Sequence, residues 1–216
     1  MNNHKSMADL LSSLIVSCRK RDLVMAQDII NDYNFEINFH YKFDKNWTPL
    51  IAAATYNAVD IAKLLLNNPK IDINLRLPFE LKNGKISYCS ALFNACRCES
   101  FDVIDLLIEN KATVTLSDIY QIIYNYTGSF TLDPRITNYF DKLVKIASNN
   151  GVNIKEDHSL LSKSQNRFEL LKIMMNYYSF DEVIELSKQT DDSKKFKINP
   201  EIEFLLKKIY IQFNLK

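Results

Sequence analysis

The 216-residue chain is poor in the residues that build turns. It contains only 3 glycines and 5 prolines, while 47% of its residues are hydrophobic. A β-sandwich needs turn residues at short intervals, so this composition favours helices. The glycines, at positions 84, 128 and 151, are also too scattered to form a phosphate-binding loop. We therefore expect a helical fold, with enough chain for one sizeable domain or an array of repeats.

The chain also lacks an excess of charge and a long hydrophobic run. Its formal net charge is +1, so no overall field draws it to nucleic acid or to an anionic membrane. No apolar run reaches the ~18 residues that a membrane-spanning helix requires. The polar first eight residues do not resemble a secretory signal peptide. We expect a cytoplasmic protein that is not inserted in a membrane.

Cysteine and histidine are too few and too irregularly spaced to indicate a reactive centre. Four cysteines in a chain of this length do not form a disulfide framework, so we expect reduced thiols. The cluster of Cys89, Cys96 and Cys98 lacks the paired C-x2-C arm of a zinc site. The three histidines, at positions 4, 40 and 158, have no nucleophile at a meaningful spacing. The sequence predicts no metal, no cofactor and no catalytic residue.

What the chain does contain is internal repetition. Residues 48–54, TPLIAAA, align with residues 90–96, SALFNAC, and an apolar segment begins seven residues after each, at 61 and at 103. The two copies keep register without a gap for about two dozen residues. An earlier copy places Leu14 where Leu50 falls and ends in Ile37-Asn38, with the same spacing as Ile73-Asn74. Repetition at such a period indicates an array of stacked units.

The pattern resembles the ankyrin repeat, whose unit begins with T-P-L-H-x-A and runs to about 33 residues. Thr48 is placed to cap a helix, and Pro49 occupies the first helical position, where its missing N–H costs nothing. Small residues at 53 and 54 allow the first helix of a pair to pack closely, and the leucines at 64–66 give the second helix a broad apolar face. Such pairs bury their apolar faces by stacking. The resemblance implies an all-α ankyrin-repeat solenoid of about four to five helix pairs with a C-terminal capping helix.

The array is expected over residues 1–190. Its repeats are placed at about 8–43, 44–82, 83–116 and 117–155, with a degenerate repeat at 156–190. A charged linker and a C-terminal helix follow at 191–216, where Asn199 and Pro200 mark the start of the helix. We interpret this helix as a cap on the open end of the stack; the alternative is a docking helix for a partner.

The connections between the repeats differ in length. Sixteen residues separate Asn74 from Ser90, against ten from Asn38 to Thr48. This predicts an oversized second finger, Leu75 to Tyr88, with a turn near Asn83-Gly84. Between Thr115 and Ser117 there is no room for a finger. We therefore expect a partner to engage the N-terminal half of the array more than the C-terminal half.

The resemblance implies a protein partner, because the concave groove of ankyrin proteins is formed by the exposed end of each first helix and by the fingers beside it. Transferred position by position, the candidate partner-binding residues are Arg19 and Lys20 in repeat one, Thr55 and Tyr56 in repeat two, Arg97 and Cys98 in repeat three, and Tyr124 in repeat four. His40 and Tyr41 lie in the first finger, and Trp47 lies at its base. The alternative for Trp47 is packing against a neighbouring finger.

The function predicted from these residues is that of a monomeric, non-enzymatic scaffold for protein–protein interaction. One alternative is an ankyrin-type effector or targeting adaptor that acts on host proteins, delivered into a host cell. A lesser alternative is a nucleic-acid-binding module, suggested by Arg19, Lys20 and Arg21 and by the interspersed tyrosines. The near-zero net charge argues against nucleic acid as a partner.

Overall fold

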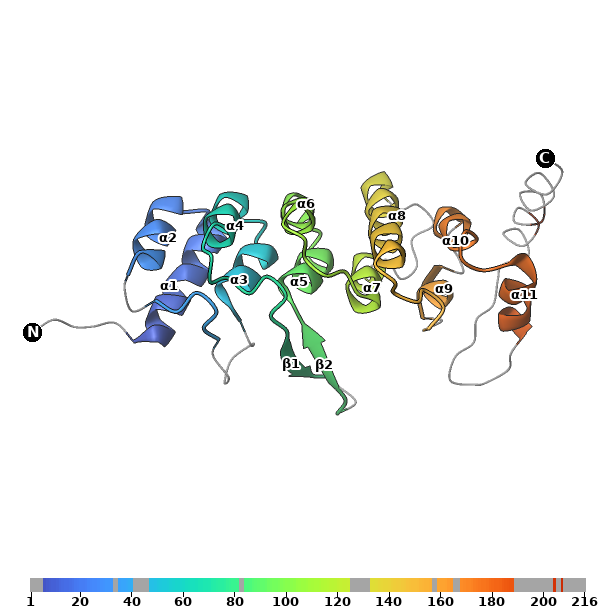
Figure 1. Ribbon diagram of the computed structural model, residues 1–216, viewed down its shortest axis with the longest axis horizontal. Helices are drawn as coiled ribbons and strands as arrows, with labels where there is room; N and C mark the ends of the chain where they lie inside the picture. Colours follow the sequence, from blue (N-terminus) through green and yellow to red (C-terminus); the bar gives the residue numbers. More distant parts are fainter. Residues whose placement is uncertain are drawn as a thin grey trace, which may run out of the picture. The chain divides into compact units, whose positions relative to one another are not determined.

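The computed structural model describes residues 6–32, 35–40, 47–81, 84–124, 133–156, 159–164 and 168–188, together with Phe204 and Lys207. Helices make up most of the regular structure (Figure 1). The chain forms two compact units, Met1–Thr113 and Val114–Lys216. Among the described helices, none is both long enough and apolar enough to cross a membrane.

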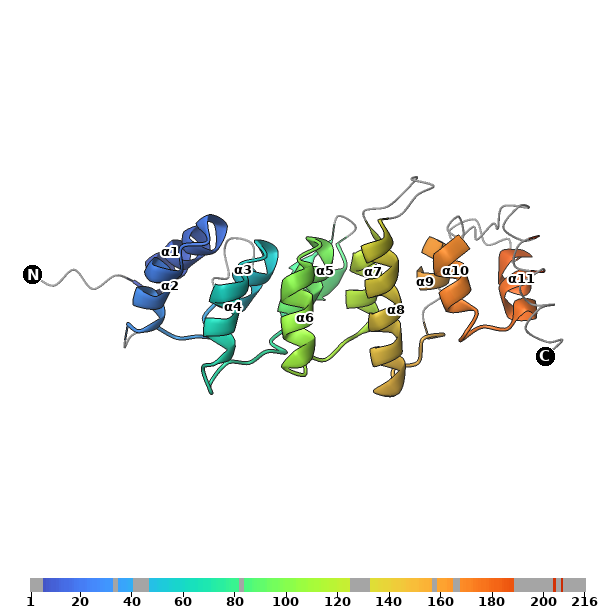
Figure 2. The same cartoon turned by 90° about the horizontal axis from the view of Figure 1, so that it is seen from above.

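The first unit consists of three consecutive helix pairs. They are α1 (Met7–Lys20) with α2 (Leu23–Ile30), α3 (Pro49–Thr55) with α4 (Val59–Leu66), and α5 (Ala91–Arg97) with α6 (Phe101–Glu109). The first helices α1, α3 and α5 contact one another in order, and so do the second helices α2, α4 and α6 (Figure 2). The stacking predicted for repeats one to three is confirmed.

The first helices begin where the repeat pattern predicts. The Thr48 hydroxyl oxygen accepts a hydrogen bond from the backbone N–H of Ile51 at 3.0 Å, and Pro49 opens the helix. Ser90 caps α5 in the same way, accepting from Phe93 at 3.1 Å. Each cap satisfies a backbone donor that a helix N-terminus leaves without an intrahelical partner.

Small side chains let the first helices approach closely. Ala52, Ala53 and Ala54 in α3 are fully buried, and so are Ala95 and Cys96 in α5. Helices whose contact surface consists of short side chains pack at the lower end of the usual 8–10 Å interaxial distance. These small side chains therefore allow the close approach of the first helices that the repeat motif predicts.

Asparagine side chains tie the segments that follow the second helices to one another. Asn38 donates to the carbonyl oxygen of Lys70 at 2.7 Å and accepts from the backbone N–H of Asp72 at 2.8 Å. Asn74, one repeat later, accepts from the backbone N–H of Thr113 at 2.8 Å. We call these contacts the asparagine ladder. They place the C-terminal ends of successive second helices side by side.

The turns between the two helices of each pair share one unusual conformation. Arg21, Asn57 and Glu99 occupy equivalent positions and have φ values of 57°, 49° and 56°. This left-handed region is strained for residues other than glycine, although asparagine tolerates it. Asn57 also uses its side chain across the repeat boundary, since it donates to the Asp102 carboxylate at 2.9 Å and accepts from the N–H of Val103 at 3.3 Å.

The second finger is a β-hairpin. Strands β1 (Leu77–Glu80) and β2 (Ile86–Cys89) pair antiparallel, with Leu77 opposite Cys89. The hairpin projects from the row of first helices on the side opposite the second helices (Figure 1). The turn contains Gly84 at φ +76°, a conformation that glycine adopts without strain. The predicted finger and its turn near Gly84 are confirmed; Asn83 lies outside the described residues.

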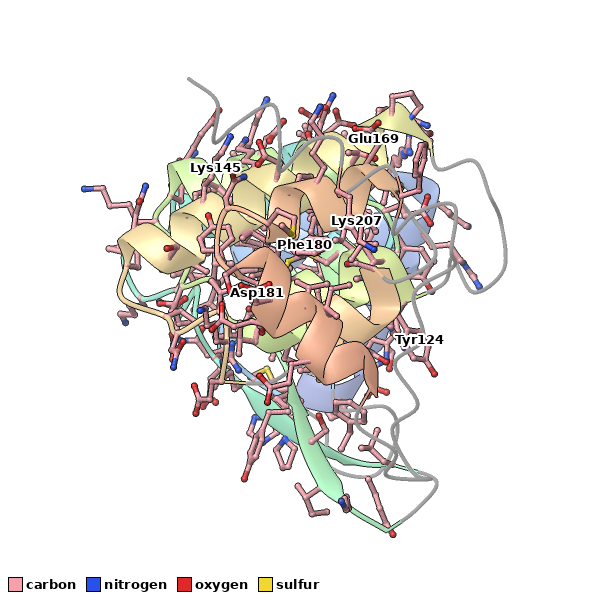
Figure 3. All side chains as sticks on the ribbon, turned by 90° about the vertical axis from the view of Figure 1, so that its right-hand side faces the viewer. Tyr124, Lys145, Glu169, Phe180, Asp181 and Lys207 are labelled. Atoms are coloured by element: carbon pink, nitrogen blue, oxygen red, sulfur yellow. The ribbon has the colours of Figure 1, made fainter. Side chains whose placement is uncertain are left out.

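The second unit contains five helices within the described residues. They are α7 (Leu116–Tyr124), α8 (Pro134–Asn149), α9 (Ser159–Ser164), α10 (Phe168–Met174) and α11 (Phe180–Lys188). Helix α7 packs against α8 and α9, and α10 packs against the same two helices. Exposed side chains such as Lys145 on α8 and Glu169 on α10 are visible in Figure 3. Helix α8 lies within the segment assigned to the fourth repeat, 117–155, and α9, α10 and α11 lie within that of the degenerate repeat, 156–190.

Contacts of single side chains fasten α11 to the segment before α9. The Lys155 ammonium lies 2.7 Å from the Glu182 carboxylate and 5.4 Å from the centre of the Tyr178 ring. Glu182 also accepts from the backbone N–H of Ser179 at 2.7 Å, and Ser179 accepts from the N–H of Glu182 at 3.2 Å. This reciprocal capping box fixes the start of α11.

No hairpin separates α6 from α7, because only six residues lie between them and none forms a strand. This agrees with the finger predicted to be missing there. The Thr115 hydroxyl and backbone N–H both donate to Asp118, at 2.7 and 2.8 Å, and cap α7. The predicted linker at 191–200 and most of the last helix lie outside the described residues. The repeat boundaries and the separate segment at 191–216 therefore stay predictions.

Candidate partner-binding surface

The C-terminal ends of the first helices lie at one end of the first unit. The asparagine ladder aligns the ends of the second helices, so the turns that lead into those helices meet at the opposite end. The contact of Asn57 with Asp102 shows this directly for repeats two and three. The six candidate residues after the small-residue pair of each repeat thus form one series, which we call the first-helix row: Arg19, Lys20, Thr55, Tyr56, Arg97 and Cys98.

Cations occupy both ends of the first-helix row. Arg19 and Lys20 are exposed in the last turn of α1, and Arg97 is exposed at the end of α5. One guanidinium nitrogen of Arg97 donates to the side-chain oxygen of Asn94 at 2.9 Å. Asn94 is itself buried and donates to the Ser90 carbonyl at 3.0 Å. The hydrogen bond to the buried Asn94 therefore restrains the Arg97 side chain, so Arg97 loses less side-chain entropy when it binds a partner.

An aromatic pair occupies the middle of the row. The rings of Trp47 and Tyr56 have centroids 5.7 Å apart and an interplanar angle of 31°. One residue precedes α3 and the other follows it, so the two half-buried rings meet alongside that helix. Trp47 thus contacts its own repeat; residues 41–46 of the first finger, with Tyr41 among them, lie outside the described residues. Thr55 is turned back onto its helix, since its hydroxyl donates to the Ile51 carbonyl at 2.9 Å.

Two other candidate residues belong to other segments of the chain. His40 is half-buried in the segment after α2. Tyr124 is 49% exposed at the end of α7 in the second unit, where its ring lies 5.5 Å from that of Tyr120. The assignment of all these residues to a binding site stays a prediction.

The hairpin has an exposed apolar face that the sequence analysis did not single out. Leu77 and Cys89 are buried, and Phe79 packs its ring 5.7 Å from that of Phe93 in α5. The opposite face carries Ile86, which is 59% exposed, and Tyr88, which is 52% exposed. The alternation of β2, in which Ser87 and Cys89 face inward, is a period-two signal that could have revealed this face.

The two rows of helices in the first unit differ in charge. The second helices carry five carboxylates, at Asp28, Asp60, Asp102, Asp105 and Glu109, against a single lysine, Lys63. The first helices carry three cations, at Arg19, Lys20 and Arg97, against the one carboxylate of Asp9, which lies in the first turn of α1 and away from the row. Within these six helices, most cations therefore lie on the first helices and most carboxylates on the second helices.

The thiols are poorly suited to chemistry. Cys18, Cys89 and Cys96 are buried, as the repeat pattern predicts for positions 18 and 96. Burial raises the pKa of the Cys18 thiol to about 12, and it also raises the pKa of Cys89 and of Cys98. Nearby Arg97 offsets this in part at Cys98. Since the thiolate is the nucleophile and the metal ligand, a raised pKa lowers the fraction of each thiol that can react. Within the described residues, no three His, Cys, Asp or Glu side chains gather as a metal site would require.

Comparison with known proteins agrees with this architecture. A family model for ankyrin repeats in three copies matches residues 2–118. No curated protein matches the chain. Among solved structures, a chain in the complex of the Bd0816 predatory endopeptidase from Bdellovibrio bacteriovorus with the immunity protein Bd3460 is similar in fold, with a TM-score of 0.50 and 20% identity over 85% of this chain and 96% of that one. Since the family match covers more than half of the sequence, the chain belongs to the ankyrin repeat family.

Proposed function

We propose that this protein is a non-enzymatic scaffold that binds a partner protein through the first-helix row and the fingers of its N-terminal repeats. Ankyrin repeats are modules of protein–protein interaction, and three copies lie in the part of the chain that carries the row. The observation that carries the proposal is the Trp47–Tyr56 pair between exposed cations at both ends of the row.

The composition of the row suits an interface. Tryptophan, tyrosine and arginine dominate interface hot spots, because each covers a large area while few rotamers are frozen. The Trp47 and Tyr56 rings already restrain each other, and Asn94 already restrains Arg97. Three neighbouring helix ends and the adjacent fingers supply enough surface for a standard interface of about 800 Å² per partner.

The state of the titratable groups supports a role without catalysis. Burial raises the pKa of the Cys18, Cys89 and Cys98 thiols, which lowers the fraction present as the nucleophilic thiolate. The candidate residues His40 and Tyr124 lie outside the row, in other segments of the chain. A scaffold of this kind acts through shape and surface chemistry, and we propose that it does so as a monomer.

The test is a triple variant, Trp47→Ala, Tyr56→Ala and Arg97→Ala, compared with the native chain for affinity toward a partner isolated from the native host. We expect affinity to fall about thirtyfold or more, since a hot-spot truncation costs 2 kcal/mol or more. A matched control changes three exposed residues of the second helices, Asp60→Ala, Lys63→Ala and Glu109→Ala. Unchanged affinity in the row variant, with its circular dichroism spectrum intact, would contradict the proposed site.

A further inference from the structure

The charge of the first-helix row bears on which partner it accepts. Three of its six residues are cations, Arg19, Lys20 and Arg97, and none is a carboxylate. Within the described residues, the structure gives Arg19 and Lys20 no ion pair, so their charges face solvent without a partner on the chain itself. Complementary charge steers association and excludes like-charged partners.

We infer that the first-helix row binds an acidic, extended segment of a partner protein, in which carboxylates flank a central apolar residue. The inference rests on the proposed function and names the chemistry of the partner. Arg19 and Lys20 receive one carboxylate group, Arg97 receives the other, and the Trp47–Tyr56 pair receives the apolar side chain between them. Arginine suits this role because its planar guanidinium binds a carboxylate through two parallel hydrogen bonds.

The spacing of the repeats sets the spacing of the acidic residues. Helices packed through small residues lie about 8 to 10 Å apart, so the ends of α1 and α5, two steps apart, are separated by roughly 16 to 20 Å. An extended chain advances about 3.3 Å per residue, so that span corresponds to roughly six residues. The apolar residue falls near the middle, opposite repeat two. A segment with two acidic positions about six residues apart therefore matches the row.

An acidic polypeptide fits the row better than a nucleic acid does. Nucleic-acid binding depends on many phosphate contacts along a continuous positive track. In the first-helix row the cations lie only at the two ends, with the uncharged Thr55 and Tyr56 between them. The half-buried carboxylate of Glu99 also directly follows Cys98. Bases would need an open aromatic face to stack on, whereas the Trp47 and Tyr56 rings lie against each other.

The experiment uses the full chain and a phage-displayed library of random 12-residue peptides as the probe. Three forms are compared: the native chain, a row-reversed variant (Arg19→Glu, Lys20→Glu, Arg97→Glu), and a control-reversed variant (Lys63→Glu, Lys70→Glu, Lys111→Glu). The control changes net charge by the same amount at exposed positions away from the row. A neutral variant, Arg19→Gln, Lys20→Gln and Arg97→Gln, covers the case in which charge reversal unfolds the chain.

We expect the native and control-reversed chains to select peptides with Asp or Glu at two positions about six residues apart around an apolar residue. The row-reversed chain should lose these peptides and select Lys and Arg instead. A synthetic peptide of the selected sequence should bind the neutral variant about tenfold more weakly than the native chain at low salt, because surface charge pairs contribute modestly and are screened.

The outcomes separate this inference from the proposed function. Peptides that depend on the row but show no acidic preference would overturn the inference and leave the proposed site standing. A library that yields no peptide, or only peptides that bind the row-reversed chain equally well, would count against both. Row-dependent binding of a 20-nucleotide single-stranded RNA, with no row-dependent peptide, would overturn the inference in favour of nucleic acid.

Discussion

The two units stack short helices with different kinds of side chain. In the first unit, alanines at 52–54 line the contact between first helices, and the asparagine ladder joins the backbones of successive repeats. In the second unit, helix α7 buries Ile119, Ile122 and Ile123 where α3 buries alanines, and the 16-residue helix α8 buries Phe140. An ion pair between Lys155 and Glu182 joins α11 to the segment before α9.

This difference explains where the repeat signal fades. Small residues at a helix contact and asparagines that bond to the next repeat's backbone are needed at the same position of every repeat. They therefore recur in the sequence at a regular period. Large apolar side chains fill space in many combinations, because cores tolerate varied packing when total volume is kept. The family match ends at residue 118, close to the boundary between the units at residue 113.

The largest effect should come from removing a large side chain in the second unit. Phe140 is fully buried in α8. We expect Phe140→Ala to lower the free energy of unfolding by about 3–5 kcal/mol, through lost burial and the remaining cavity. Urea unfolding followed by circular dichroism measures this loss of stability. The control is Asn138→Ala, a substitution at an exposed position of the same helix. A loss no greater than in the control would show that α8 does not hold this core together.

Adding volume in the first unit should come next. Ala53 has no exposed surface where the first helices meet. Ala53→Leu should destabilise the protein by about 1–3 kcal/mol, because the neighbouring helices must move apart. The same urea titration is compared with Ala8→Leu, a half-buried position in the first turn of α1. A neutral Ala53→Leu would mean that close approach is not what this unit depends on.

A rung of the asparagine ladder should contribute less. Asn38→Ala removes two hydrogen bonds to the backbone of the next repeat, and we expect a loss of about 1–2 kcal/mol. Asn110→Ala is the matched control, since that side chain bonds only to the Leu106 carbonyl of its own helix. Hydrogen exchange at the Asp72 amide should also quicken in Asn38→Ala. Equal stability of the two variants would argue against the ladder as a tie between repeats.

The smallest effect should be the contribution of Glu182, and it should depend on pH. The hydrogen bond from Lys155, together with those from the Ser179 backbone N–H and hydroxyl, lowers the pKa of Glu182 to about 2 in the folded chain. An unfolded glutamate titrates near about 4.3, so the stabilisation is complete above that pH and is lost as pH falls toward 2.

Thermal melts of Glu182→Gln and the native chain test this dependence. The difference in melting temperature should be present at pH 6 and should vanish near pH 2. Glu185→Gln, exposed on the same helix, serves as the control. A difference that persists unchanged at low pH would assign it to the capping box alone.

Much of the fold could be predicted because the informative residues act locally. The caps at Thr48 and Ser90 follow from a hydroxyl before an apolar helix, and the hairpin turn follows from a single glycine in a long connection. The burial of Cys18 and Cys96 follows from their alignment with Ala54. Each of these inferences needs only a short segment of the sequence and the rule that successive repeats stack on one another.

The arrangement of the candidate site could be predicted only in part. The first-helix row follows from the repeat alignment, but the contact of Trp47 with Tyr56 depends on the rotamers of two residues, one before α3 and one after it. Which face of the hairpin is exposed depends on which face of the strand pair packs against Phe93. These are choices among conformations of similar local energy, and tertiary contacts decide them.

The asparagine ladder also bears on how such a protein can change in length. Each rung joins a side chain of one repeat to main-chain atoms of the next, and every amino acid except proline supplies the N–H that it needs. A duplicated or transplanted repeat that keeps the small residues of its first helix would thus be accepted by the ladder of its predecessor, and it would need its own asparagine for its successor. At the corresponding place after the third repeat the residue is Thr115, which bonds to Asp118 at the start of α7.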